Sequence, residues 1–133
     1  MEIHHKVAGV ILRDRKFLMV RKYDEPHFIM PGGRMKPGEE PLECLTRELK
    51  EELGVELMSL KKFDTYEAPH FRDKNKLIRM ETYRVTVCGN PNPQAEINEM
   101  QWVDSHYAER GLKLASIDQD FLVPALREKG YID

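Results

Sequence analysis

The chain has 133 residues, of which 41% are hydrophobic and 33% are charged, and its formal net charge is −2 at pH 7. This length fits one domain over residues 1–133 with a core of ordinary size. The near-neutral charge excludes a general binder of polymeric nucleic acid or of anionic membranes, which would carry a basic excess. With neither an apolar run of about 18 residues nor a signal-peptide pattern, we expect a cytoplasmic protein.

Two residue types that often bind metals are sparse and poorly spaced for it. Cys44 and Cys88 are too few for a disulfide framework and lack metal-binding spacing, so we expect both to be reduced and buried. His4 and His5 lie near the N-terminus, where we expect solvent-exposed side chains rather than ligands.

The first elements that the chain predicts are strands. Residues 5–12 and 16–22 are short apolar runs rich in β-forming residues, separated by the charged turn 13–15, which predicts a hairpin. Residues 27–30 predict a third short strand, which leads into Gly32 and Gly33. Because glycine has no Cβ, backbone carbonyls in this pair can approach a ligand or an ion closely.

A helix follows within the stretch Gly33 to Val55, which reads GRMKPGEEPLECLTRELKEELGV. Apolar residues recur there at spacings of three and four, at Leu42, Leu45, Leu49 and Leu53. This period predicts an amphipathic helix with one face on a core. Pro41 suits its first position and Gly54 suits the left-handed conformation just past its end. Glu40 caps a helix less well than Ser, Thr, Asp or Asn, so the start is weaker.

Three glutamates, Glu48, Glu51 and Glu52, lie on one flank of this helix, because 3.6 residues complete a turn. Like charges at these spacings destabilise a helix by a few tenths of a kcal/mol per pair, so the cluster favours cationic neighbours or a bound metal. Carboxylates on a rigid element suit Mg²⁺, which binds substrate phosphates through its remaining positions. A solvated glutamate-rich face is the alternative interpretation.

The loop before the helix favours the metal site. Together they match G-x5-E-x7-R-E-U-x-E-E-x-G-U, with U apolar, at Gly33, Glu39, Arg47, Glu48, Leu49, Glu51, Glu52, Gly54 and Val55. Seven specified positions coincide by chance with a probability on the order of 10⁻⁸ per start site. The stretch resembles a complete Nudix box, so the chain is identified as a member of the Nudix hydrolase family.

The resemblance implies a fold and a chemistry. The fold is α+β, a three-layer α/β/α sandwich with a mixed β-sheet, and the reaction is hydrolysis within the pyrophosphate of a nucleoside diphosphate linked to another moiety. The implied cofactor is Mg²⁺, with Mn²⁺ as a substitute, held by the Gly32 carbonyl and by Glu48, Glu51 and Glu52. Such ions screen the phosphates and activate a water for in-line attack on phosphorus.

The resemblance also implies supporting roles. Glu39 would bind metal directly or through water, and Arg47 would orient nearby carboxylates by ion pairing. A basic residue at the end of the second strand, Arg21 or Lys22, would contact substrate phosphates. Ordinary strand-end charge is the alternative for these two residues.

Downstream, residues 56–68 and 77–88 predict two longer strands. In the polar loop between them, Phe71 is a candidate contact for a base or a sugar. An acidic residue shortly before Trp102 would approach the metals from outside the box; Glu96 is the first choice and Glu99 the second. The general base stays open among Glu48, Glu51 and a loop carboxylate such as Glu96, and the metal bridge between Glu51 and Glu52.

The end of the chain predicts a short helix over 105–110 and a terminal one over 120–129, with Phe121 facing inward. Asp118 caps the terminal helix in this interpretation. The nucleoside triphosphate branch of the family offers another, in which Asp118 or Asp120 binds the edge of a purine.

The expected function is therefore that of a nucleoside triphosphate pyrophosphohydrolase, acting on ordinary, oxidised or otherwise damaged nucleotides. ADP-ribose, sugar nucleotides and dinucleoside polyphosphates are alternative substrates, and a non-catalytic nucleotide sensor is the alternative outside enzymes. The expected partner is a small nucleotide, with no membrane and no polymeric nucleic acid, and the expected assembly is a monomer or a homodimer.

Overall fold

The computed structural model describes residues 1–70 and 72–133. In chain order its elements are β1 (Glu2–Arg13), β2 (Lys16–Lys22), β3 (Gly32–Arg34), α1 (Pro41–Leu53), β4 (Glu56–Pro69), β5 (Lys76–Cys88), β6 (Ile97–Val103), the 3₁₀ turn η1 (Tyr107–Arg110), the π-helical turn η2 (Asp118–Leu122) and α2 (Val123–Glu128). No helix within the described ranges is long and apolar enough to cross a membrane.

The described strands form one six-stranded mixed sheet in the order β4-β5-β1-β2-β6, with β3 paired to β1. The long β1 runs parallel to β5 from Glu2 to Ile11, and pairs with β2 only at its far end. That end is the predicted hairpin, whose turn residues Asp14 and Arg15 both have positive φ, as the tight type I′ connection requires. β3 lies antiparallel to the middle of β1, with Gly32 opposite Ala8.

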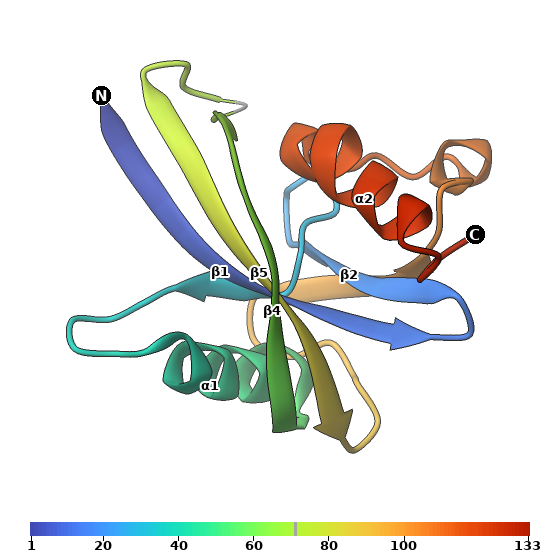
Figure 1. Ribbon diagram of the computed structural model, residues 1–133, viewed down its shortest axis with the longest axis horizontal. Helices are drawn as coiled ribbons and strands as arrows, with labels where there is room; N and C mark the ends of the chain where they lie inside the picture. The colour runs from blue at the N-terminus through green and yellow to red at the C-terminus, as the bar shows by residue number, and fades with distance from the viewer. Residues whose placement is uncertain (71) are drawn as a thin grey trace.

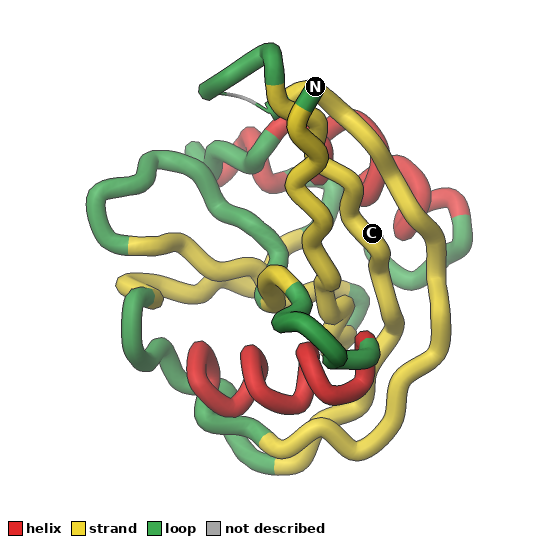
Figure 2. Tube along the Cα trace, turned by 90° about the vertical axis from the view of Figure 1, so that its left-hand side faces the viewer, coloured by secondary structure: helices red, strands yellow, loops and turns green. Residues whose placement is uncertain are grey.

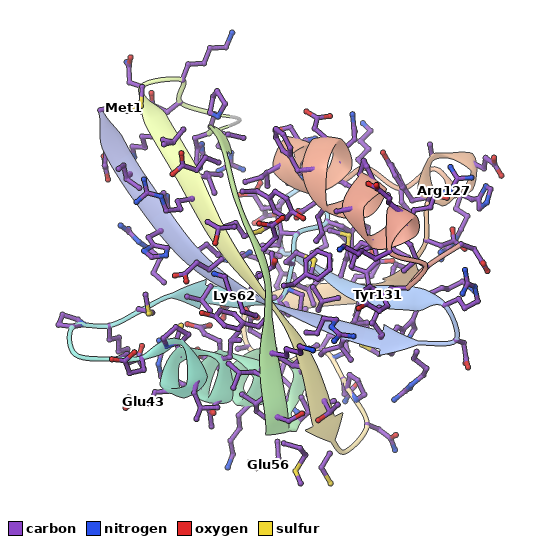
Figure 3. All side chains as sticks on the ribbon, in the orientation of Figure 1. Met1, Glu43, Glu56, Lys62, Arg127 and Tyr131 are labelled. Atoms are coloured by element: carbon purple, nitrogen blue, oxygen red, sulfur yellow. The ribbon has the colours of Figure 1, made fainter. Side chains whose placement is uncertain are left out.

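Helices cover both faces of the sheet, which confirms the three-layer α+β architecture (Figure 1). One core cluster packs α1 against the sheet through Cys44, Leu45, Leu49 and Leu53. The other packs η2 and α2 against the opposite face through Leu122, Val123 and Leu126. In Figure 3, Glu43 on α1 and Arg127 on α2 accordingly lie on opposite sides of the sheet.

The box helix forms as predicted. Pro41 occupies its first turn and Gly54 ends it at φ +68°. The Glu40 backbone N–H donates to the Glu43 carboxylate at 3.2 Å, which supports the start despite the weaker cap residue. Leu42 is 49% exposed, so the buried stripe begins only with Cys44 and Leu45.

Four other expectations about the fold were wrong in detail. Residues 27–30 form only isolated bridges, Val20 to Ile29 and Phe28 to Leu114, because Pro31 has no N–H for a continuous ladder. Cys88 is exposed, since strand alternation turns it away from the α1 side, where Val87 packs. Phe121 is 43% exposed, although its ring stacks on Tyr66. Asp118 does not cap the terminal helix; it is a buried residue inside η2.

Candidate functional site

A cavity of about 390 Å³ opens where the box helix meets the sheet. Its walls come from β1, the end of β2, β3, α1, β5 and the loops after β2, after β4 and before β6. Figure 2 shows α1 running along one side of the strands, with the loop that precedes it folded back toward the sheet. The first residues of the box and its helix therefore border one cavity together with β1 and β2.

One end of the cavity is acidic. Glu48 and Glu52 reach it from α1, Glu96 reaches it from the loop before β6, and Gly32 and Gly33 form the strand edge between them. The exposed Glu96 is fixed at its backbone, where its carbonyl accepts from the Tyr23 N–H at 3.3 Å. Residues far apart in sequence thus bring three carboxylates to a single cavity.

Glu52 is the buried member of this group, only 2% exposed. Its Oε1 accepts a hydrogen bond from the Gly32 N–H at 2.9 Å. Burial raises the pKa of Glu52 to about 7; the charges of Glu48 and Glu96 act in the same direction, while Gly32 and Lys6 oppose it. The ionised form of Glu52 is therefore unfavourable at this position unless a cation is bound beside it.

Glycine at position 33 is what admits the Glu48 carboxylate. A Cβ on Gly33 would lie 2.7 Å from both Cδ and Oε1 of Glu48, closer than real Cβ contacts come. Gly32 has φ +138°, and a Cβ there would lie 2.0 Å from the Val7 carbonyl oxygen. Glycine is therefore required at position 33 because a Cβ would clash with Glu48. At position 32 it is required because φ is positive and the Val7 carbonyl oxygen lies close.

Arg47 holds two of the box carboxylates, as the sequence predicted. Its Nε and Nη2 both donate to the Glu39 carboxylate at 2.8 Å, and its Nη1 donates to Glu48 Oε1 at 2.7 Å. Nη2 also reaches the Arg34 carbonyl at 3.2 Å. These hydrogen bonds lower the pKa of Glu39 to about 2, so Glu39 is ionised throughout the physiological range.

The candidate residues left open by the sequence lie at different places in the structure. Glu96 lines the cavity, whereas Glu99 accepts from Arg21 at 3.1 Å and 3.2 Å outside it. Lys22 likewise lines the cavity, while Arg21 is held by Glu99 and by the Glu25 carbonyl. Glu51 is exposed and is not among the lining residues.

Among the described candidate contacts for the nucleobase, Asp118 and Asp120 do not line the cavity. Phe71 falls outside the described residues. Asp118 is 1% exposed and does not line the cavity, and its Oδ1 has no hydrogen-bond partner among the described residues. Burial raises its pKa to about 7, against the effect of Lys6. Asp120 is exposed on η2.

Nine described lining residues were not among the predicted site residues: His4, Lys6, Glu25, His27, Ile29, Arg34, His70, Arg72 and Ile78. One of them, His4, was expected to be solvent-exposed. His4 and Lys6 share a strand face with the buried Ala8 and Val10, because alternate residues of β1 point the same way. In the sequence, this change from polar to apolar residues along one face was the signal that could have indicated His4 and Lys6 as lining residues. The imidazoles of His4 and His70, which both line the cavity, stack with their centroids 5.9 Å apart.

The acidic end fits a hard divalent cation. All its side-chain donors are carboxylate oxygens, the buried Glu52 carries a raised pKa next to two other carboxylates, and the missing Cβ of Gly33 leaves room for one of them. Over the described ranges, no three acidic, His or Cys side chains are already gathered as a metal cluster. The fit therefore rests on the donor chemistry and on the shared cavity.

Comparison with known proteins agrees with this geometry. The sequence model described as NUDIX domain matches residues 3–123. The chain is 34% identical over 82 residues to the 8-oxo-dGTP diphosphatase of Haemophilus influenzae, covering 61% of this chain and 57% of that protein. It is 30% identical over 90 residues to the CTP pyrophosphohydrolase of Escherichia coli, covering 64% of each.

A solved structure extends the likeness to nearly the whole chain. The solution structure of the E. coli ORF135 protein superposes with a TM-score of 0.76 at 25% identity, covering 97% of this chain and 94% of that one. The curated relatives are matched over only 34% to 64% of their own lengths. The family match spans most of the chain and includes every residue of the acidic cavity end, so the chain belongs to the NUDIX domain family.

Proposed function

We propose that this protein is a Mg²⁺-dependent nucleoside triphosphate pyrophosphohydrolase, which releases a nucleoside monophosphate and pyrophosphate. One observation carries the proposal: Glu48, Glu52 and Glu96 line a single cavity at the edge formed by Gly32 and Gly33. A polyphosphate cannot approach three carboxylates without a cation between them. In addition, the chain belongs to the NUDIX domain family and carries every specified position of the box.

In this proposal Glu48, Glu52, Glu96 and the Gly32 carbonyl hold the cation, and we retain Glu51 as a further ligand because it lies on the same helix flank. When bound, Mg²⁺ would neutralise phosphate charge and lower the pKa of a coordinated water. Hydrolysis then needs a group that accepts the proton of the attacking water. Glu96 suits this role best, because its exposed carboxylate faces the cavity from a loop.

Residues beside the acidic end and one further lining residue would position the reactants. Arg47 fixes Glu48 through the 2.7 Å hydrogen bond and is itself clamped by Glu39, so the Glu48 carboxylate is held in one orientation. Lys22 contributes a cation at the rim, where it would bind phosphate oxygens of the substrate. In this proposal the carboxylates hold the metal, and Lys22 binds the phosphates.

The substrate class is proposed from two of the relatives, whose names refer to 8-oxo-dGTP and CTP, while a third relative is named an ADP-ribose pyrophosphatase. The two names share a triphosphate and differ in the base, so we propose triphosphates without choosing a base at this point. Asp118 carries an Oδ1 without a hydrogen-bond partner among the described residues, but it is buried and does not line the cavity, so the choice of base is not assigned to it. Diphosphate-linked nucleotides and a non-catalytic sensor are the competing assignments.

The test is product analysis by anion-exchange chromatography after incubation with Mg²⁺. The panel contains the dNTPs, 8-oxo-dGTP, CTP, ADP-ribose, a sugar nucleotide and a dinucleoside tetraphosphate. We expect monophosphate and pyrophosphate from at least one triphosphate. Monophosphates from a diphosphate-linked compound alone would move the assignment to that class, and binding without turnover of any compound would identify a sensor.

A further inference from the structure

The cavity has a second end that the proposed chemistry does not use. Opposite the carboxylates, the wall is formed by β1 and β5, with Ile78 beside His4 in the parallel register. The stacked imidazoles of His4 and His70 continue this wall to the mouth. Flat rings and an aliphatic side chain suit the face of a heterocycle rather than a phosphate chain.

Lys6 stands between these two ends. On β1 it is two residues from His4 toward the mouth and two residues from Ala8, whose partner on β3 is Gly32. At a rise of about 3.3 Å per residue, Lys6 lies roughly 7 Å along β1 from His4 and the same distance from Ala8. A nucleotide with its phosphates at the Gly32 edge and its base on the β1–β5 wall must therefore pass over Lys6.

The Lys6 ammonium is positioned rather than free to move. Its Nζ donates to the Met30 carbonyl at 2.7 Å, and Met30 lies in the segment that leads into Gly32. An ammonium has three N–H donors, and this is the hydrogen bond that the structure shows for Lys6 among the described residues. The side chain nevertheless lines the cavity, so its remaining N–H groups can meet a ligand there.

Negative charge around Lys6 comes from both sides. Burial lowers the pKa of Lys6, and Asp118 on η2 and Glu52 on α1 are the acidic groups that oppose this effect most strongly. Lys6 presents its ammonium to the cavity at this position, beside the cation of Arg34, its cross-strand partner on β3. A base carrying a carbonyl oxygen there gains a charge-assisted hydrogen bond, whereas an amino group places donor against donor.

We propose that Lys6 is a specificity-determining residue that donates a hydrogen bond to a carbonyl oxygen of the bound nucleobase. The inference rests on the proposed function for the direction in which the nucleotide lies. It predicts that the cavity favours 6-oxopurines over 6-aminopurines and, by the same chemistry, uracil over cytosine. Neither the box nor the relatives assign a role to this residue.

The experiment compares pairs of ligands that differ at one position of the base. Titration calorimetry with Mg²⁺ measures the dissociation constants of IMP and AMP, and of UMP and CMP, for the wild type, Lys6→Met and Lys6→Arg. Lys61→Met, on an exposed position of β4, is the matched control. Thermal unfolding of each variant checks that it is folded.

We expect the wild type and Lys61→Met to bind IMP about 10-fold to 100-fold more tightly than AMP, which is the range of a hydrogen bond to a charged donor. Lys6→Met should bring this ratio near one, and Lys6→Arg should keep most of it. Equal affinities in the wild type, or an unchanged ratio in folded Lys6→Met, would overturn the inference. The wild-type comparison decides even if Lys6→Met fails to fold.

Hydrolysis of ITP and ATP by the wild type separates this inference from the proposed function. If the protein hydrolyses neither but still discriminates IMP from AMP through Lys6, the proposed function fails and the role of Lys6 stands. If it hydrolyses both without discrimination, the role of Lys6 fails and the proposed function stands. Absence of binding by all four monophosphates would overturn the role of Lys6, while hydrolysis of ITP or ATP would still decide the proposed function.

Discussion

The Glu52 carboxylate on α1 accepts a 2.9 Å hydrogen bond from the backbone N–H of Gly32 on β3. This contact joins the helix and the loop of the sequence motif at a buried position, beside Glu48 and Gly33. Each half of the motif therefore depends on the other for its geometry. The first predictions concern this joint.

Gly33→Ala should displace the Glu48 carboxylate, because the added Cβ would lie 2.7 Å from it. We expect the affinity for Mg²⁺ to fall about 10-fold, the lower range for disturbing the support of a metal ligand. Calorimetric titration with MgCl₂ measures this loss. Because both changes act on one side chain, Gly33→Ala and Glu48→Gln should not add in the double variant. Additive losses would show that the glycine acts elsewhere.

Glu52 should make the metal-free protein less stable as the pH rises. Burial raises its pKa in the folded state to about 7 from an ordinary value of 4.5. Between these values the folded protein retains a proton that the unfolded chain releases, so the free energy of unfolding falls with rising pH. Urea unfolding in EDTA at about pH 5 and pH 7 measures the slope. Glu52→Gln should flatten it, and parallel slopes in the two proteins would contradict the burial effect.

Glu39 should act in the opposite direction at low pH. Its hydrogen bonds to Arg47 lower its pKa to about 2 from 4.5, so its stabilising contribution is complete above the unfolded value and is lost as the pH falls toward 2. Between about pH 5 and pH 3 the wild type should therefore lose more urea resistance than Glu39→Gln. Glu128→Gln, at an exposed position of α2, is the control and should follow the wild type.

Glu96 and Glu99 should differ in their effect on turnover, although they are three residues apart. Glu96 lines the cavity, whereas Glu99 is held by Arg21 outside it. If Glu96 is the general base, Glu96→Gln should lower kcat about 100-fold or more. Glu99→Gln should change kcat by less than about threefold, since it touches no reacting group. Steady-state kinetics of both variants on one triphosphate decide the matter, and a reversed order would exchange the two assignments.

The fold was predictable where local signals agreed with each other. Pro41, the leucine spacing and Gly54 all point to one helix, and the paired apolar runs around Asp14 point to one hairpin. Propensity failed at residues 27–30, where the missing N–H of Pro31 outweighs the apolar composition. It also failed at Cys88, whose exposure depends on which face of the sheet a helix covers.

The site was predictable to the extent that a motif lists it. Glu39, Arg47, Glu48 and Glu52 lie together because one loop and one helix carry them. Glu96 was a candidate because of its place before Trp102 and the family resemblance, and it lines the same cavity. Lys6, His4 and Ile78 could not be found in this way, since they meet only when β1 pairs with β5. The different positions of Lys22, which lines the cavity, and of Arg21, which is held by Glu99 78 residues away, likewise could not be read from the sequence.

The most direct test of the account is the turnover of Glu52→Gln beside the wild type, on whichever triphosphate the wild type hydrolyses, with Mg²⁺ and then with excess EDTA. Because Glu52 is proposed to hold the cation at the Gly32 edge, we predict a loss in kcat of about 100-fold or more in the variant. The wild type should also lose its activity in EDTA. The variant should unfold at a temperature close to that of the wild type or higher, since glutamine can accept the same hydrogen bond from Gly32. Near-wild-type turnover by the folded variant, or full wild-type turnover in EDTA, would contradict the proposed metal-dependent mechanism.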